Sequence, residues 1–220
     1  MDALRNVVEG PQTLANCSGR MDWPIRGVYF FYEAGEERRE SGSGPRVVRI
    51  GTHALKAGSG TTLWNRLAQH RGLTNSGGGN HRGSIFRLLV GTALMARSRL
   101  DYPTWGAGSS ADRRTRQGEL PLERLVSDHI RQMPFLWLSV LDDAGESSQR
   151  GHIERNSIAL LSNYGKPPID PPSAGWLGLW CPRERVRESG LWNQNHVDGT
   201  YDPGFMDVLE ARVAAMKVQV

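Results

Sequence analysis

The carboxylate of Glu154 stands at a position where a charge is costly unless it has a partner. Residues 149–163 predict a helix whose apolar arc includes Ile153, Ile158 and Leu161, and Glu154 falls inside that arc. Burying a carboxylate there requires a metal ion or a buried arginine beside it. A metal partner would make Glu154 a ligand or a catalytic acid or base, whereas an arginine partner would make it structural.

A cationic pair stands on a second predicted helix, residues 61–71. Arg66 and His70 are four positions apart, so their side chains stack on one side of that helix. They border the apolar stripe formed by Leu63 and Leu67, where a side chain points into the seam between helix and sheet. The planar fork of arginine suits phosphate, although an ordinary solvent-facing pair would show the same spacing.

Two segments rich in strand formers, residues 26–33 and 46–52, predict an antiparallel hairpin with a long connection. Because side chains alternate between faces, the faces opposite the apolar ones can bring Tyr29, Arg49 and His53 together. A solvated hairpin face that carries a tyrosine by chance would give the same pattern.

A glycine-rich loop at residues 77–83 leads into a predicted helix that Ser84 can cap. The free N–H groups and the dipole of a helix N-terminus favour anions, so His81 and Arg82 are candidates for phosphate contacts. The loop does not match the GxxxxGK[ST] pattern, and we therefore predict no ATP site. A flexible linker is the alternative.

These segments, in this order, resemble the GIY-YIG nuclease family. Residues 27–29 (GVY) resemble the GIY element, and residues 49–51 (RIG) resemble the YIG element with arginine in place of its tyrosine. Arg66 lies on the next helix, as the family's catalytic arginine does, and His70 matches a histidine of some restriction-type members. Glu154 resembles the metal-binding glutamate, and the asparagine that often follows it in the family is matched by Asn163.

The resemblance implies a metal-dependent endonuclease that hydrolyses phosphodiester bonds in DNA, of a restriction, repair or defence type. Glu154 would hold one Mg²⁺ or Mn²⁺, and Arg66 would stabilise the transition-state charge. Tyr29 would take a proton from water with His70 as a relay or phosphate contact, and which of the two is the general base stays open. Arg49 would lower the pKa of the tyrosine. The expected nucleic-acid contacts are His53, His81, Arg82 and Asn163.

The predicted order of elements indicates an α+β fold with a small, mostly antiparallel three-stranded sheet flanked by helices, a GIY-YIG-like core with a C-terminal extension. We expect an irregular N-terminal arm at residues 1–24 and the nuclease core at 25–164, with an insertion at about 99–118. Residues 165–220, including a predicted final helix at 203–218, form the extension, a candidate for target recognition or dimer contacts. One such centre cuts one strand, so a double-strand cut would need a homodimer or two successive events.

Composition narrows the classes of partner. The chain has 220 residues, a formal net charge of +4 and a pI near 9.4, which is compatible with a nucleic-acid partner. No apolar run approaches the roughly 20 residues that span a bilayer, so we expect no membrane partner. The start does not resemble a signal peptide, and Cys17 and Cys181 are expected to be free thiols, which favours a cytoplasmic location.

Three other interpretations stay open at this stage. The protein could be an RNA or structure-specific nuclease, or a nucleic-acid-binding module whose catalysis has lapsed. Glu154 argues against the lapsed module, since binding alone does not require a carboxylate in an apolar arc. A structural or partner-binding protein is the third, suggested by the tryptophans of the tail, Trp176, Trp180 and Trp192.

Overall fold

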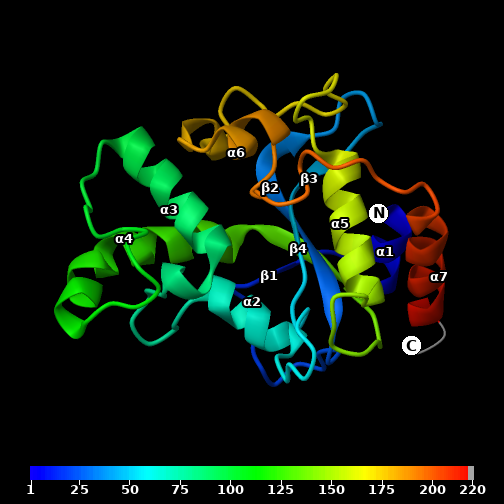
Figure 1. Cartoon of the computed structure of the whole chain (residues 1–220), viewed down its shortest axis with the longest axis horizontal. Helices are drawn as coiled ribbons and strands as arrows, with labels where there is room; N and C mark the ends of the chain where they lie inside the picture. The colour runs from blue at the N-terminus through cyan, green and yellow to red at the C-terminus, as the bar shows by residue number, and fades with distance from the viewer. Residues whose placement is uncertain (218–220) are drawn as a thin grey trace.

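The structure is a computed structural model, and it describes residues 1–217 (Figure 1). Its centre is a four-stranded sheet in the order β1-β4-β2-β3, in which every neighbouring pair is antiparallel. The strands are β1 (Gln12–Thr13), β2 (Gly27–Glu37), β3 (Pro45–Gly51) and β4 (Pro134–Ser139). The α+β class is confirmed, but the expectation of three strands was wrong. The missed strand, β1, is two residues long, too short to show a hydrophobic period, and it forms because β4 offers a free edge.

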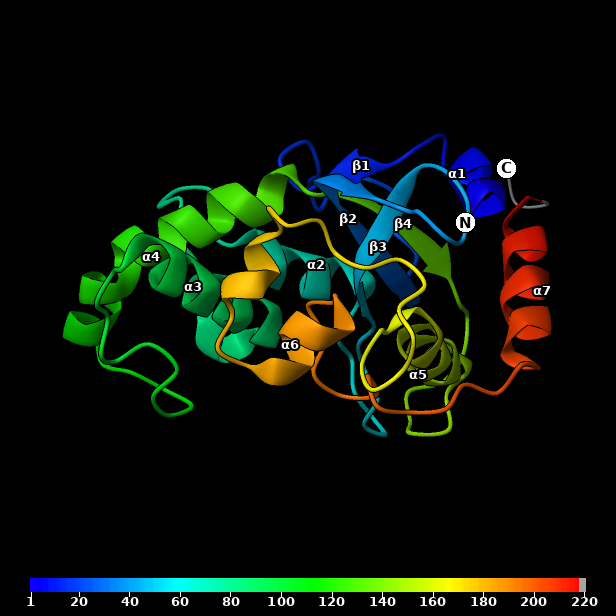
Figure 2. The same cartoon turned by 90° about the horizontal axis from the view of Figure 1, so that it is seen from above.

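Helices cover both faces of this sheet (Figure 2). One face carries α2 (Leu63–Arg71), α3 (Ile85–Ser98) and α4 (Arg113–Gln132). The other carries α1 (Asp2–Val7), α5 (Gln149–Leu161) and α7 (Phe205–Lys217). Among residues 1–217, no helix is long and apolar enough to cross a membrane.

The central strand β2 contributes side chains to a hydrophobic core on each face of the sheet. Tyr29 and Phe31 belong to the core under α2, α3 and α4, whereas Val28, Phe30 and Tyr32 belong to the core under α5 and α7. We expected one apolar and one polar face for this hairpin, and that expectation was wrong. A strand that has helices on both faces is buried on both, so its polar side chains must find partners inside the protein.

Local capping explains where the helices around the hairpin begin. Thr62 accepts a hydrogen bond from the backbone of Asn65 at the start of α2, and Ser84 does the same for Arg87 at the start of α3. Gly72, with φ of 76°, ends α2. The helix expected at 203–218 is present as α7, and Val218 lies outside the described residues.

The helix α4 begins at Arg113, inside the segment at about 99–118 that we took for an insertion. Gly118 and Pro121 suggest a break, but Asp112 caps the helix by accepting the N–H of Thr115. Proline removes one intrahelical hydrogen bond, and the exposed position of Pro121 limits that cost.

The segment after α5 contains two short helices, η2 (Leu177–Trp180) and α6 (Glu184–Ser189), and it packs onto the core. The indole nitrogens of Trp176 and Trp192 both donate to Oε2 of Glu33, at 3.0 and 3.1 Å. The backbone N–H of Trp192 also donates to the carbonyl of Val48, on the outer edge of β3. The extension therefore covers a sheet edge that would otherwise be open.

Candidate active site

A cleft of about 420 Å³ lies at the β3 side of the sheet, where the two helical layers meet. The structure brings Arg49 from β3, Arg66 from α2 and Glu154 from α5 to this cleft, although they are far apart in sequence. The extension supplies the opposite wall. The residues that line the cleft are Arg49, Thr52, Leu55, Arg66, Ile85, Glu154, Ile158, Asn193, Gln194, Asn195 and His196.

The Glu154 carboxylate is held by one hydrogen bond and by the charges around it. Its Oε1 accepts the backbone N–H of Thr52 at 3.1 Å, and no cationic side chain of residues 1–217 forms an ion pair with it. Burial raises the pKa of this carboxyl above its ordinary value, while Arg49, the Thr52 N–H and Arg66 oppose that rise. The arginines are thus close enough to act on its charge but are not its partners.

The donor set suits a hard divalent cation. Oε2 of Glu154 receives no hydrogen bond from residues 1–217, and Asn193 and Asn195 line the same cleft as Glu154. Mg²⁺ and Mn²⁺ prefer oxygen ligands, and Mg²⁺ often keeps several waters while binding one or two carboxylates. No group of three or more His, Cys, Asp or Glu side chains in the described chain is arranged for a metal ion. A cation held here would therefore rely on a single protein carboxylate.

The two arginines of the cleft each keep unused hydrogen-bond donors. Arg49 donates from Nη1 to the Trp192 carbonyl at 2.6 Å. Arg66 donates from Nη1 to Oε1 of Gln69 at 3.0 Å and to the Gly83 carbonyl at 3.2 Å. Within residues 1–217 the Nε of both arginines is buried without a hydrogen-bond partner. Guanidinium groups that are fixed by backbone carbonyls and still have free N–H groups can bind a phosphate diester.

A hydrogen-bonded tyrosine–histidine pair lies in the core on the α2 side of β3. The Tyr29 hydroxyl is 2.8 Å from Nε2 of His70, and Nδ1 of His70 is 2.8 Å from the Ser84 hydroxyl. Both rings are fully buried. Burial, and then the charges of Arg66, Arg49 and Arg87, hold the pKa of His70 well below its ordinary value, so the imidazole is neutral. Tyr29 and His70, to which the resemblance assigns the proton transfer, are therefore hydrogen-bonded to each other, although neither residue lines the cleft.

His53 lies apart from this pair. Its Nδ1 donates to the Thr61 carbonyl at 2.9 Å, and its Nε2 is buried without a partner among the described residues. Burial lowers the pKa of His53 to about 4, with smaller contributions from Arg150 and Arg26 in the same direction and an opposing one from the Thr61 bond. His53 is not among the residues that line the cleft, and it forms no hydrogen bond with Tyr29 or Arg49.

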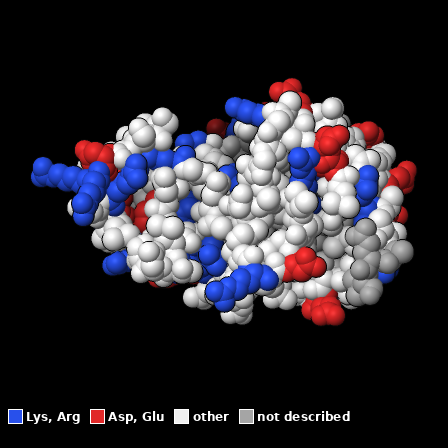
Figure 3. Space-filling model, turned by 90° about the horizontal axis from the view of Figure 1, so that it is seen from below, with Lys and Arg blue, Asp and Glu red and all other residues white. Residues whose placement is uncertain are grey.

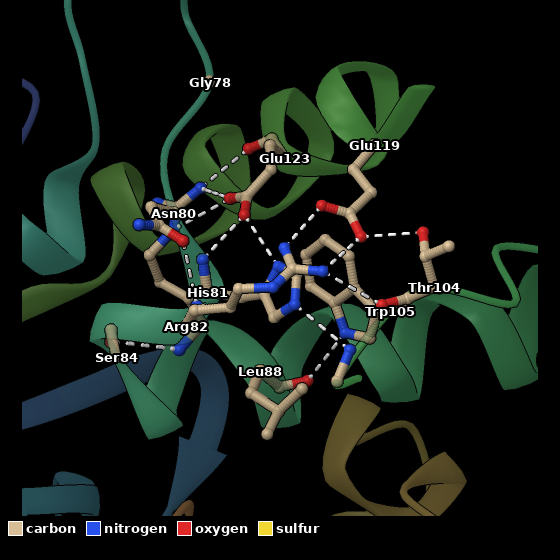
Figure 4. Close-up of polar contacts among 12 residues, drawn as sticks. Gly78, Asn80, His81, Arg82, Ser84, Leu88, Thr104, Trp105, Glu119 and Glu123 are labelled. Atoms are coloured by element: carbon tan, nitrogen blue, oxygen red, sulfur yellow. Dashed lines mark hydrogen bonds and ion pairs between the residues drawn. The ribbon is translucent and has the colours of Figure 1, made fainter. Parts of the chain in front are cut away.

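His81 and Arg82, the expected phosphate contacts, have carboxylate partners (Figure 4). Glu123 accepts both the backbone N–H and Nδ1 of His81, at 2.7 and 3.0 Å, and the His81 ring stacks on Trp105 with centroids 3.8 Å apart. Arg82 forms two bonds to Glu119, at 2.6 and 2.8 Å. The polar atoms of His81 and Arg82 bond the loop to α4, which favours a structural role over the expected contact with phosphate.

Asn163 also has its side chain occupied. Its Oδ1 accepts the N–H of Ile169 at 3.0 Å, and its Nδ2 donates to the Asp170 carbonyl at 3.2 Å. The side chain thereby closes the turn after α5, and it does not line the cleft. These bonds favour a structural role for Asn163 in this turn over the expected nucleic-acid contact.

Asn193 is the residue of the cleft that sequence reasoning missed. Its Oδ1 accepts the N–H of Ile50 at 3.1 Å and its Nδ2 donates to the Ile50 carbonyl at 2.9 Å, as a neighbouring strand would. Together with the preceding Trp192 carbonyl, this contact fixes β3 and the guanidinium of Arg49. No local signal reveals this role, because a single asparagine in an irregular tail has no period or motif around it.

A family model described as the GIY-YIG domain matches residues 1–219 of the chain. The chain belongs to the GIY-YIG domain family, which confirms the resemblance read from the sequence and points to a nuclease. The match covers almost the whole chain, including the arm and the extension. No significant match is found among curated proteins or among solved structures.

Proposed function

We propose that this protein is a divalent-metal-dependent endonuclease that hydrolyses phosphodiester bonds in DNA, with the cleft at the edge of β3 as its active site. The observation that supports this most is the position of Glu154, a half-buried carboxylate without an ion-pair partner in residues 1–217, which lines a cleft with two arginines. A purely structural carboxylate at this depth would be expected to pair with one of those arginines.

Arg49 and Arg66 would bind the scissile phosphate. Each has one Nη anchored to a protein oxygen, so its remaining donors are oriented before the substrate arrives. Preorganised donors of this kind stabilise charge that develops on the phosphoryl oxygens without reorganising during the reaction. Arg66 bridges α2 and the end of the glycine-rich loop, and its Nε is the buried donor left free for a phosphate oxygen.

Tyr29 and His70 would accept the proton of the attacking water. The neutral imidazole can take the phenolic proton at Nε2 while the phenolic oxygen takes a proton from water. Burial and then the cleft arginines hold the pKa of His70 low, and a bound phosphate would offset the contribution of those arginines. Proton acceptance would thus become easier when substrate is bound. Because the phenol is fully buried, this role requires water to reach the pair in the complex.

Glu154 would hold one Mg²⁺ or Mn²⁺ through Oε2. When bound, such an ion supplies Lewis-acid chemistry, polarising phosphoryl oxygens and making a bound water more acidic. The Thr52 N–H fixes Oε1, which would leave Oε2 for the ion. One cleft cuts one strand, and a double-strand cut would therefore use two chains or two successive events.

Supercoiled plasmid and a matched RNA transcript, each with Mg²⁺, Mn²⁺ or EDTA, test this proposal. We expect nicking of the plasmid with either metal, no nicking in EDTA, and slower cleavage of the RNA. Faster cleavage of RNA would change the substrate class to the alternative of an RNA nuclease. A folded protein that cuts no nucleic acid with either metal would refute the endonuclease proposal.

A further inference from the structure

A groove of about 790 Å³ runs between α2, the glycine-rich loop and α4. It adjoins the cleft, because Arg66 of the cleft donates to the side chain of Gln69 and to the carbonyl of Gly83, which both line the groove. At the α4 side it is lined by Arg116, in the first turns of that helix. Arg66 therefore stands between the cleft and the groove, and a chain that passes Arg66 would reach the groove next.

The groove offers donors, and its acidic groups are neutralised. Its wall carries the amide side chains of Asn65, Gln69 and Asn80. Glu119 forms an ion pair with Arg82 at 2.6 Å, and Glu123 accepts a hydrogen bond from Nδ1 of His81 (Figure 4). Glu123 also forms an ion pair with Arg87. A polyanion that lies here would meet amide and guanidinium N–H groups, while both carboxylates are already paired.

Beyond the groove, α4 begins with Arg113, Arg114 and Arg116, all exposed. Cations at a helix N-terminus oppose the helix dipole, and this first turn contains no acidic residue to offset them. None of the three forms an ion pair within residues 1–217, although Asp112 caps the helix beside them. Figure 3 shows basic side chains projecting at the end of the molecule formed by α3 and α4. These three charges disfavour the helix and have no ion-pair partner among the described residues.

We infer that this groove and the arginines at the start of α4 bind the phosphodiester backbone of the DNA that flanks the cleavage site. The inference rests on the proposed function, since it is the cleft that supplies the DNA strand. The inference is carried by charge complementarity. The exposed arginines of α4 lie at one end and the arginines of the cleft at the other, and the groove between them has paired carboxylates and amide side chains. Contacts of this kind position the duplex without reading its sequence.

Two variants test the surface by binding alone. R113Q/R114Q removes two charges whose side chains have no hydrogen bond to residues 1–217, so the fold should be unaffected. N65D places a negative charge in the groove at the first turn of α2, where a carboxylate favours the helix dipole. The matched control, R212Q/K217Q, removes two charges from α7, at the opposite end of the molecule (Figure 1).

The measurement is the dissociation constant for a 30-base-pair fluorescent DNA duplex in EDTA, followed as a function of salt. We expect R113Q/R114Q to weaken binding severalfold and to reduce the slope of log K against log salt by about 2, for two lost phosphate contacts. N65D should weaken binding with an unchanged melting temperature, and the α7 control should match the wild type. An unchanged slope in R113Q/R114Q together with wild-type binding by N65D would overturn the inference.

The same titrations separate this surface from the nuclease reaction. Binding in EDTA requires no cleavage, so a wild-type protein that cuts nothing but shows the expected variant pattern supports the groove and refutes the nuclease. A protein that nicks plasmid while both groove variants bind like wild type supports the nuclease and refutes the groove. Unlabelled duplex RNA can be added as a competitor of the fluorescent DNA. If it displaces the DNA more strongly than duplex DNA does, and the groove variants lose this difference, the assignment to DNA is overturned.

Discussion

The hydroxyl of Tyr29 can lie 2.8 Å from Nε2 of His70 because residue 51, opposite Tyr29 in the sheet, has no side chain. A Cβ at Gly51 would stand 2.2 Å from the phenolic oxygen, closer than any real contact. The glycine of the RIG segment is therefore required by the tyrosine of the GVY segment. The two halves of the family motif, GVY and RIG, therefore pack directly against each other in the hairpin.

Gly51→Ala should displace the Tyr29 ring and break its bond to His70. The methyl group has no space in a fully buried position, and overpacking of this kind costs about 1–3 kcal/mol. Urea unfolding should show that loss, and nicking activity should fall further than stability explains. Gly83→Ala is the matched control, because no atom lies within 4 Å of a Cβ built there and its φ is not positive. A Gly51→Ala protein with wild-type stability and activity would show that the close contact has no consequence.

Arg66→Ala should leave a folded protein that cleaves DNA more slowly by on the order of 10²–10³, the usual cost of removing one preorganised donor. Arg66→Lys keeps the positive charge but not the fork, so it should recover only part of the rate. The measurement is the single-turnover nicking rate, with a melting curve for each variant, because Arg66 also bonds to the Gly83 carbonyl. Cleavage at the wild-type rate by folded Arg66→Ala would remove this residue from the mechanism.

Stability should fall as the pH is lowered from about 6.5 towards 4, because two buried histidines have depressed pKa values in the folded protein. The unfolded chain binds protons at His53 and His70 near pH 6.5, whereas folded His53, with a pKa of about 4, does not. The stabilisation is therefore fully present above 6.5 and is lost as the pH falls through this window. His53→Gln should flatten the dependence, and an identical slope in this variant would assign the acid sensitivity to other groups.

The sequence predicts most of what lies on regular elements. The helical wheel placed Glu154 in an apolar arc, and the i, i+4 spacing placed Arg66 and His70 together on α2. It could not place Asn193 or β1, since each acts through a pairing with a distant strand edge. For His81 and Arg82 the local pattern was that of an anion site. The carboxylates that bind them belong to α4, about 40 residues later, and no pattern in the loop indicates such a partner.

Glu154→Gln tests most directly whether Glu154 is a metal ligand. Glutamine keeps the shape and removes the charge. Because burial raises the pKa of this carboxyl, its ionised form costs stability above the ordinary pKa of about 4.5, so the variant should be as stable as wild type or slightly more stable at pH 7.

The measurement is a pair of melting curves, with and without Mn²⁺, on wild type and Glu154→Gln. We predict that Mn²⁺ raises the melting temperature of the wild type only, since an ion that binds the folded state stabilises it by mass action. The variant should melt at or above the metal-free wild type and should not nick plasmid. A loss of about 3–5 kcal/mol, as expected when a buried ion pair is broken, with an unchanged response to Mn²⁺, would make Glu154 structural and contradict the account.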